Sequence, residues 1–509
     1  MAARPIMTTI SSHSPLRLAV VGHTNTGKTS LLRTLTRNPH FGEISNRPGT
    51  TRHVEGARLL INAHTAIELY DTPGMEDSMA LLEYIDGTLV DKDERLDGPD
   101  QIQRFLDSPE SQGRFEQEAR VLRALLECHA GLYVIDSRDP VLAKHKDELH
   151  LLARCGHPIM PVLNFTDTSD QRPDEWRHAM ARLGLHVTVE FDTVAPALDG
   201  ETQLYDKLAL LVGSGAGLLH ALRQNVVEQR WQRREDAIML IAEMVIDIAA
   251  WRSTTPSDED AMVAATRYLR STVRQREHLC VQALLRRYNF DSTTFPAHQL
   301  PLQGERWQMD LFHPEALKDM GIHVTKGLAA GAMAGATIDA LAAGVTLGTG
   351  TLIGAAAGGI WQGADKWGKR LYGRLRGFQE LSVDETVIRL LIVRQLALLD
   401  ALDRRGHAAQ DPIMLVTDES SDAETTSPPT GTDYRHGRLP DIITSARAHP
   451  QWSALSESYT PGRAREQAIR TLAQALGATS PAAVQPDPAP TDSGTTPSHS
   501  DSSPSDTAS

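Results

Sequence analysis

The sequence predicts an α/β domain with a mostly parallel sheet, followed by an α-helical domain with a Gly-rich helical hairpin and a disordered carboxyl-terminal tail. Strand-like and helix-like segments alternate over residues 16–212, after a loose, disordered tail at residues 1–15. Helix-like segments dominate residues 213–408, and Ser, Thr, Pro and Asp dominate residues 409–509. With 509 residues, 40% of them hydrophobic, the chain can bury a sizeable core.

Short apolar runs bounded by turn residues predict the strands of the first domain. Residues 30–36 and 117–128 are two of the helix-like runs between them, and this alternation favours a sheet flanked by helices, with a nucleotide at the carboxyl ends of its strands. Residues 86–114 are polar and rich in Asp and Gly, and they are predicted to form an inserted loop. The predicted strands are residues 16–21, 54–61, 65–70, 130–135, 159–163 and 186–191.

Apolar residues at helical spacing predict the helices of the second half of the chain. Two long helices are expected at residues 218–251 and 258–288, and an amphipathic helix at residues 381–404. A short helix at residues 462–476 is expected to interrupt the tail.

Composition argues against several classes of protein. The net charge of −14 argues against a protein that coats nucleic acid, although it is compatible with a local basic patch. The three cysteines form no C-x-x-C pair, which indicates a reducing compartment, no Cys-based metal site and three small buried residues. No sustained apolar core occurs in the first 15 residues, so no secretory signal is predicted and the expected location is cytoplasmic.

A phosphate-binding motif lies at residues 22–29, where GHTNTGKT fits the pattern G-x-x-x-x-G-K-[ST]. A predicted strand precedes it and a predicted helix follows. The glycines let backbone N–H groups approach phosphate oxygens, and the helix N-terminus adds partial positive charge. Lys28 is expected to reach the β- and γ-phosphates, and the Thr29 hydroxyl to bind Mg²⁺. The nucleotide-binding residues predicted here are Gly22, Asn25, Thr26, Gly27, Lys28, Thr29 and Ser30.

Two later motifs suit a triphosphate with its metal. The run PGTTR at residues 48–52 precedes a predicted strand, and Thr51 there could offer its hydroxyl to Mg²⁺ and its N–H to the γ-phosphate. The run DTPG at residues 71–74 follows another strand, so that Asp71 would hold Mg²⁺ through water and the Gly74 N–H would meet the γ-phosphate.

A base-reading motif, NFTD, follows the predicted strand at residues 159–163. Asp167 in this run can accept hydrogen bonds from N1–H and the exocyclic amine of guanine. Adenine offers neither donor at these positions, so the carboxylate would be left unpaired. Asn164 is expected to support this loop.

In this order, the four motifs resemble those of P-loop GTPases, and PGTTR and DTPG resemble the Era/TrmE branch, the potassium-dependent one. The resemblance covers about residues 16–212. It implies a GTP-binding G domain that hydrolyses GTP to GDP and phosphate as a molecular switch, with Mg²⁺. It also implies that Asn25 binds K⁺, although a polar residue that caps the loop is the alternative. The carboxyl-terminal half resembles an uncharacterised domain found in some bacterial GTPases, which implies no mechanism.

Three positions depart from the family pattern. Phe165 replaces the Lys of Asn-Lys-x-Asp, which normally packs over the base, although an aromatic ring could stack there instead. Residues 191–193, FDT, stand where Ser-Ala-x is usual. Met75 follows DTPG, so the water-orienting Gln of Ras-like proteins is absent. Glu83 could orient a water, or could be a solvated glutamate on a helix face. The predicted catalytic residues are Lys28, Thr51, Gly74 and Glu83.

Partners are suggested by the Gly-rich residues 322–364, followed by a cluster of Lys and Arg at 366–376. Small residues four apart suit close helix pairs, either in a membrane or in a soluble or self-associating seam. Aromatic and basic residues at one end fit the cytoplasmic face of a membrane. The alternatives to a switch are therefore a membrane-associated or self-associating scaffold that uses nucleotide as a structural ligand, and a GTPase associated with RNA.

Overall fold

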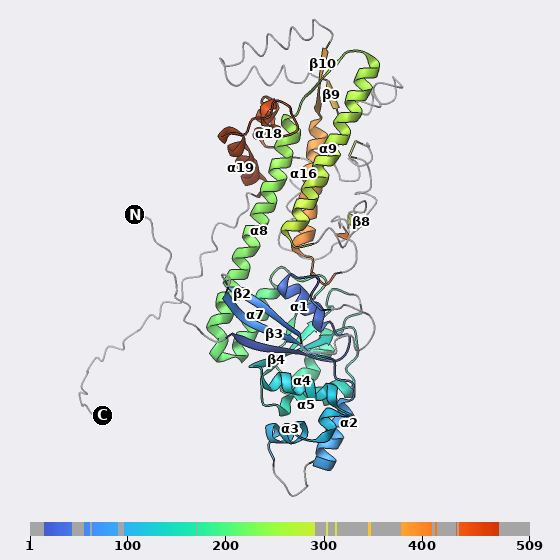
Figure 1. Ribbon diagram of the computed structural model, residues 1–509, viewed down its shortest axis with the longest axis vertical. Helices are drawn as coiled ribbons and strands as arrows, with labels where there is room; N and C mark the ends of the chain where they lie inside the picture. Colours follow the sequence, from blue (N-terminus) through green and yellow to red (C-terminus); the bar gives the residue numbers. More distant parts are fainter. Residues whose placement is uncertain are drawn as a thin grey trace, which may run out of the picture.

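The computed structural model describes residues 15–42, 55–61, 64–89, 96–168, 170–290, 302–303, 311–312, 345–347, 378–409, 413–414, 434 and 437–477. An α/β domain forms one end of an elongated molecule, and long helices rise from it toward the other end (Figure 1).

A six-stranded sheet forms the centre of the α/β domain, in the order β2-β3-β1-β4-β5-β6. All neighbouring strands are parallel except β2 and β3, so the predicted α/β fold with a mostly parallel sheet is confirmed. The last strand is much shorter than expected, because only two of the residues predicted there pair with β5. The strands are β1 Leu16–Val21, β2 Glu55–Ile61, β3 His64–Asp71, β4 Ala130–Asp136, β5 Ile159–Asn164 and β6 Val189–Glu190.

Helices cover both faces of this sheet. One face packs against α1, α7 and the first turns of α8, and the other against α2 to α6. Cys128 and Cys155 are buried on this second side, and Cys280 is buried in the helical domain, as predicted. The helices are α1 Lys28–Thr36, α2 Ser78–Tyr84, the π-helical turn η1 Ile85–Leu89, α3 Gly98–Leu106, the 3₁₀ turn η2 Pro109–Gln112, α4 Glu116–Leu126, α5 Ala143–Arg154, α6 Pro173–Arg182 and α7 Gly200–Leu211.

The expected inserted loop at residues 86–114 is largely helical, which corrects the prediction. Asp97 caps α3 by accepting a hydrogen bond from the Asp100 N–H at 3.0 Å. Ile102, Phe105 and Leu106 lie at helical spacing and are buried against the sheet domain. Burial of this apolar stripe outweighs the polar composition of the segment.

The helical domain is built on α8, which runs without a break from the sheet domain into a second core. Leu219, Leu222 and Val226 pack with the sheet, whereas Ile238 to Ala250 lie in the core of the helical domain. The elements of this second half of the chain are the 3₁₀ turn η3 Gly213–Gly215, α8 Ala216–Ala250, β7 Ser253–Pro256, α9 Glu259–Arg287, β8 Leu302–Gln303, β9 Val345–Leu347, β10 Phe378–Val383, α16 Glu385–Asp403, β11 Ile413–Met414, α18 Asp441–Arg447, the 3₁₀ turn η5 Pro450–Trp452 and α19 Arg463–Gly477.

Two further expectations are corrected in this domain. The short helix predicted at residues 462–476 is confirmed as α19, whereas residues 437–452, assigned to the mostly disordered tail, contain α18 and η5; α18 and α19 both lie against α8 (Figure 1). Arg465 of α19 donates to the buried Asp247 of α8 at 2.9 Å, and this charged contact gives the segment a fixed place. Residues 345–347 of the expected helical hairpin form β9, which pairs antiparallel with β10, and the end of β10 at residues 381–383 occupies the start of the amphipathic helix predicted at residues 381–404.

Most of the Gly-rich segment 322–364 and the basic cluster at 366–376 lie outside the described residues, as do residues 1–14 and 478–509. Within the described residues, no helix combines the length and apolarity that a membrane crossing requires.

Candidate nucleotide site

The candidate phosphate loop connects the carboxyl end of β1 to the N-terminus of α1. Gly27 has φ 93° and Gly22 has φ 140°, conformations that side chains disfavour. A Cβ at Gly22 would lie 2.5 Å from the carbonyl oxygen of Val134 on β4, and a Cβ at Gly27 would collide with the amide of Asn164. Both glycines are therefore required by close contacts with the ends of neighbouring strands.

Lys28 is buried and folds back over the loop. Its Nζ donates to the carbonyl oxygens of Gly22 at 3.0 Å and His23 at 2.7 Å. Burial lowers the pKa of Lys28 to about 8, although the nearby carboxylates of Asp71 and Glu148 oppose that shift. The ammonium is thus held at the loop and is mostly protonated at neutral pH.

The two predicted Mg²⁺ ligands that the structure describes lie together. The Thr29 hydroxyl donates to Oδ2 of Asp71 at 2.6 Å, and Asp71 is 1% exposed at the end of β3. A hydroxyl and a carboxylate are hard oxygen ligands, which suit Mg²⁺. Thr51, the third predicted ligand, lies outside the described residues.

Gly74 lies directly against the phosphate loop. A Cβ added to it would approach the backbone N of Thr24 to 2.6 Å, and His23 forms a parallel bridge with Met75. This contact places the DTPG segment beside the phosphate loop, and its role at the γ-phosphate stays a prediction.

Helix α4 holds the same segment from outside. The side-chain amide of Gln117 donates to the carbonyl oxygen of Gly74. One carboxylate oxygen of the buried Glu118 accepts from the backbone N–H groups of Glu76 and Asp77, at 2.9 Å each. The sequence analysis missed both α4 residues, because only the topology brings them to this edge of the sheet.

Asn164 ties the base side of the site together. Its Nδ2 donates to the carbonyl oxygen of Thr26 at 3.0 Å. Its Oδ1 accepts from the backbone N–H groups of Phe165 at 2.9 Å and Thr193 at 3.0 Å. One fully buried amide therefore joins the phosphate loop to the two loops that follow β5 and β6, as its predicted supporting role requires.

Phe165 has φ 57°, a left-handed conformation that is uncommon for residues other than glycine. The guanidinium of Arg138 lies 4.2 Å from the centre of its ring, a cation–π contact. Asp136 at the end of β4 accepts from Arg138 Nε at 2.9 Å and from its second terminal nitrogen at 2.7 Å, and this pairing raises the pKa of Arg138. A positive charge thus lies over the ring that stands in place of the family's lysine, and the sequence analysis did not identify it.

Asp167 is anchored through its backbone while its side chain is exposed. Its N–H donates to Oδ2 of Asp192 at 3.0 Å, and the other oxygen of that carboxylate accepts from Val194 at 2.8 Å and Ala195 at 3.0 Å. Asp192 therefore organises the loop after β6, and Asp167 presents a carboxylate to solvent near the loop after β5.

Two predicted residues are not brought into a defined contact with the site. Asn25 is exposed at the tip of the phosphate loop with φ 66°, which fits a loop position as well as a ligand role. Glu83 lies on the exposed face of α2, and within the described residues no hydrogen bond or ion pair joins it to the phosphate loop. Ser30 lies in the first turn of α1 beside Thr29.

A buried ionisable network, which no sequence motif signals, adjoins the phosphate loop. Glu148 of α5 is fully buried. One of its carboxylate oxygens lies 2.7 Å from Nδ1 of His23, and the other accepts a hydrogen bond from the hydroxyl of Tyr133 at 2.7 Å. The Lys144 Nζ lies 2.8 Å from the other ring nitrogen of His23. This network fixes the second residue of the loop.

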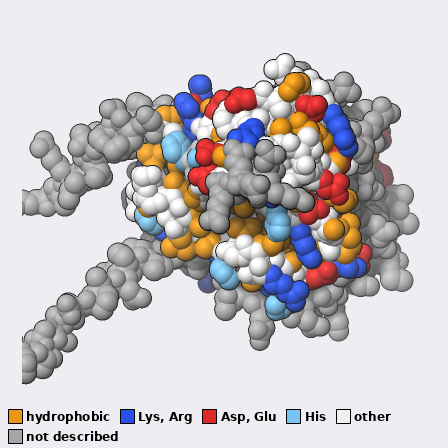
Figure 2. All heavy atoms as spheres, turned by 90° about the horizontal axis from the view of Figure 1, so that it is seen from below, with side chains coloured by type: hydrophobic (Ala, Val, Ile, Leu, Met, Phe, Trp, Pro, Cys, Tyr) orange, Lys and Arg blue, Asp and Glu red, His pale blue; other side chains and the backbone are white. Residues whose placement is uncertain are grey.

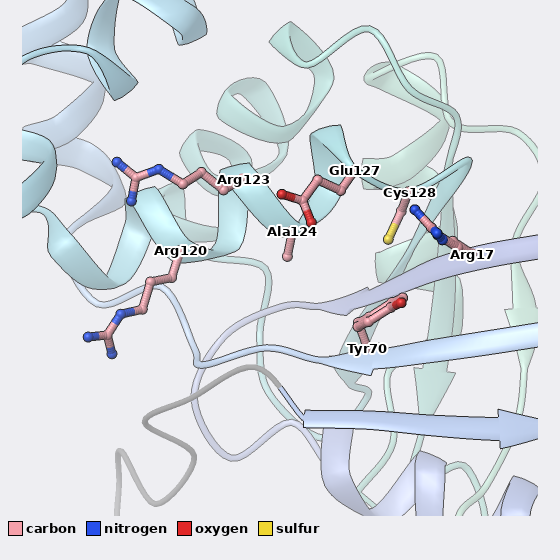
Figure 3. Close-up of a pocket in the computed structure, with 7 residues that line it drawn as sticks. All are labelled: Arg17, Tyr70, Arg120, Arg123, Ala124, Glu127 and Cys128. Atoms are coloured by element: carbon pink, nitrogen blue, oxygen red, sulfur yellow. The ribbon is translucent and has the colours of Figure 1, made fainter.

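A separate pocket of about 250 Å³ lies between the start of β1 and α4, away from these residues. Its side chains do not converge, because the guanidinium groups of Arg120 and Arg123 point away from Tyr70 and Cys128 (Figure 3).

On the lower face of the domain in Figure 1, basic and acidic side chains of the described residues are interspersed (Figure 2). Neither feature resembles an anion site as closely as the loop at residues 22–29 does.

Comparison with known proteins adds two family matches. Residues 177–474 match the family model described as "Domain of unknown function (DUF3482)", and residues 17–165 match the model described as "50S ribosome-binding GTPase". The first match begins within α6 and reaches into α19, so it includes residues that the sequence analysis assigned to the tail.

Among curated proteins, a tRNA modification GTPase MnmE from Mycoplasmoides gallisepticum is 37% identical over 70 residues. The match covers 14% of this chain and 15% of that protein, so the chain spans only a small part of the relative's length.

Solved structures of G domains are similar at lower identity. An Era variant from Aquifex aeolicus bound to GDP and aluminium fluoride is 19% identical, with 38% of this chain and 56% of that chain covered at a TM-score of 0.28. The G domain of the T. maritima FeoB iron transporter is also 19% identical, with 39% of this chain and 99% of that one covered at a TM-score of 0.23. With TM-scores this low, neither likeness supports a functional argument.

Proposed function

We propose a function from the premise that this chain belongs to the family described as "Domain of unknown function (DUF3482)" and that its amino-terminal domain is a P-loop GTPase domain. The proposal is that the chain binds GTP at residues 22–29, hydrolyses it to GDP and phosphate, and acts as a molecular switch. The observation that carries it is the geometry of Lys28, Thr29 and Asp71, which meet at the carboxyl ends of β1 and β3.

The phosphate side supplies charge and orientation. Lys28 exchanges its two loop carbonyl partners for the β- and γ-phosphates, and the loop N–H groups and the N-terminus of α1 bind the same oxygens. Thr29, and Asp71 through water, would hold Mg²⁺, with Thr51 as a further proposed ligand. When bound, the ion would supply positive charge to the phosphates.

The γ-phosphate is sensed through backbone groups. Gly74 already lies beside Thr24, so a small movement of the DTPG segment would bring its N–H to a phosphate oxygen. Gln117 and Glu118 hold that segment, and we propose that they carry its movement to α4. Asn25 is the proposed K⁺ ligand, and its exposed position at the loop tip leaves it accessible to a cation.

The base is selected on the side of Asn164. The exposed Asp167 carboxylate accepts two hydrogen bonds from guanine, and Phe165 with Arg138 forms a platform for the purine face. Membrane association, self-association and RNA contact stay predictions that depend on residues 322–376, which lie mostly outside the described part of the chain.

Release of phosphate from GTP by the full chain, in Mg²⁺ and K⁺, tests the proposal. We expect Lys28→Ala to lower the turnover rate by about 100-fold, because it removes a preorganised charge from the transferring phosphoryl group. Replacing K⁺ by Na⁺ should slow the wild type and leave Asn25→Ala unaffected. Equal rates for wild type and Lys28→Ala would show that turnover does not use this site and favour the scaffold alternative.

A further inference from the structure

The helical domain touches the α/β domain at the loop that follows β6. The N–H of Gly406, just after α16, donates to the carbonyl oxygen of Val194 at 2.8 Å. A Cβ added at Gly406 would lie 2.7 Å from the carbonyl carbon of Thr193 and 3.1 Å from the carbonyl oxygen of Val194. The backbone of one domain therefore lies directly on the backbone of the other, with no room for a side chain between them.

The contacted loop belongs to the base side of the site. Thr193 donates its N–H to Asn164 at 3.0 Å and accepts at its carbonyl oxygen from the Thr34 hydroxyl of α1 at 2.8 Å. Its neighbour Asp192 accepts from the N–H of Asp167 at 3.0 Å. A displacement of Thr193 and Val194 would move the anchors of both Asn164 and Asp167.

The Gly406 loop is itself fixed to the helical domain. The His407 ring stacks on Phe290 with centres 4.5 Å apart, and its Nε2 lies 3.0 Å from the carbonyl oxygen of Tyr288. The Tyr288 hydroxyl donates to Asp403 at 2.6 Å, and Asp403 pairs with Arg234 of α8. The loop therefore moves with α8, α9 and α16 rather than on its own.

A second connection between the domains lies elsewhere. The first turns of α8 pack with Leu219, Leu222 and Val226 against the sheet domain, on a helix that is continuous with the helical core. Loss of the Gly406 contact would thus leave the two domains joined, and its effect on the base side can be measured in the intact chain.

We propose that Gly406 is a positioning residue for guanine recognition: the helical domain, through Gly406, holds the loop at residues 192–195 so that Asp167 meets the base. This inference rests on the proposed function and deepens it. Guanine selectivity becomes a joint property of the two domains, and a partner that shifts the helical domain changes the affinity for the base without touching the phosphates.

The test uses Gly406→Ala in the full chain, with equilibrium binding of GTP, ITP and inorganic tripolyphosphate in Mg²⁺. ITP lacks the exocyclic amine of guanine, so the ratio of GTP to ITP affinity reports how well Asp167 is placed. We expect GTP affinity to fall about 10-fold and that ratio to fall toward one, while tripolyphosphate binds as to the wild type. Gly217→Ala is the matched control, because its Cβ would meet no atom within 4 Å.

His407→Ala is a second variant, in case Gly406→Ala fails to fold. It loosens the same loop without placing an atom against Thr193, and a smaller fall in the GTP to ITP ratio is expected. An unchanged ratio in the folded variants, or an equal loss of tripolyphosphate binding, overturns the inference. If wild type does not prefer guanine at all, the proposed function fails instead, so the two failures are distinguishable.

Discussion

The two sides of the candidate site differ in what holds them. On the phosphate side, Lys28 contacts the loop carbonyl of Gly22 and Thr29 contacts Asp71, all within the α/β domain and at positions that short motifs specify. On the base side, Phe165 departs from the family pattern, Arg138 supplies a charge from the turn after β4, and Gly406 contacts the loop after β6 from the helical domain. The phosphate chemistry is thus local, whereas base selection depends on the tertiary structure.

This difference indicates how the chain could be regulated. A partner of the helical domain has a direct contact with the base side through Gly406, whereas it reaches the phosphate loop indirectly, through the bonds of Thr193 to Thr34 of α1 and to Asn164. Because the metal and phosphate contacts lie on one side and the base contacts on the other, variants on each side should separate overall nucleotide affinity from base preference.

Thr29→Val should strongly weaken Mg²⁺-dependent nucleotide binding without changing base preference. The change removes the hydroxyl that meets Asp71 while keeping the volume of the side chain. We expect about 100-fold weaker binding of GTP and ATP alike, since a hard oxygen ligand to the metal is lost. Titration in excess chelator is the control, because there the variant and the wild type should bind equally. A changed ratio of GTP to ATP would contradict the local character of this side.

Asp167→Asn should shift the base preference of the site from guanine toward xanthine. The amide offers an N–H where the carboxylate offered only acceptors, so guanine loses its partner and xanthine, with an oxygen at C2, gains one. GTP affinity is expected to fall about 50-fold and XTP affinity to rise, with tripolyphosphate binding unchanged. Competition binding of the three ligands measures this, and parallel changes in all three would place Asp167 outside the base site.

The contrast between the sides also explains what the sequence could predict. Lys28, Thr29, Asp71, Asn164 and Asp167 were identified because each lies at a fixed offset from a strand end. Arg138 follows β4 but belongs to no nucleotide motif, Glu118 and Gly406 follow no strand end, and only the fold brings the three to the site.

Elsewhere, composition misled the prediction. The Asp- and Gly-rich residues 86–114 suggested a loop, although Ile102, Phe105 and Leu106 at helical spacing already signalled α3. The helix α19 matches the one predicted at residues 462–476, but its contact with α8 through Arg465 and Asp247 was not predicted, because no local pattern connects such distant residues.

Phe165→Leu should weaken the binding of guanine and adenine nucleotides to the same extent. Leucine is also apolar, and it would adopt the same left-handed backbone conformation at a similar energetic cost as phenylalanine. The variant therefore loses mainly the aromatic ring and its contact with Arg138. Stacking contributes about 1–3 kcal/mol per base, so about 10-fold weaker binding is expected for GTP and ATP alike. Phe165→Tyr, which keeps the ring, is the matched control. Unaltered affinity in Phe165→Leu would remove the ring from the site.

Nucleotide affinity should decline above about pH 8. The pKa of Lys28 is about 8 in the unliganded protein, and the phosphates favour the charged form, so the pKa rises in the complex and binding takes up protons. Affinity for GTP should therefore fall a few-fold between pH 7.5 and 8.7. Calorimetry at pH 8 in two buffers of different ionisation enthalpy measures the uptake, which Lys28→Ala should lose. Proton release in the wild type would contradict this assignment.

Competition between GTP and ATP for the full chain, in Mg²⁺ and K⁺ at cellular concentrations, tests the central claim most directly. The account predicts that GTP displaces a labelled guanine nucleotide at least 100-fold more effectively than ATP, because only guanine satisfies the Asp167 carboxylate. Equal displacement by the two nucleotides, or displacement by neither, would contradict the assignment of this site.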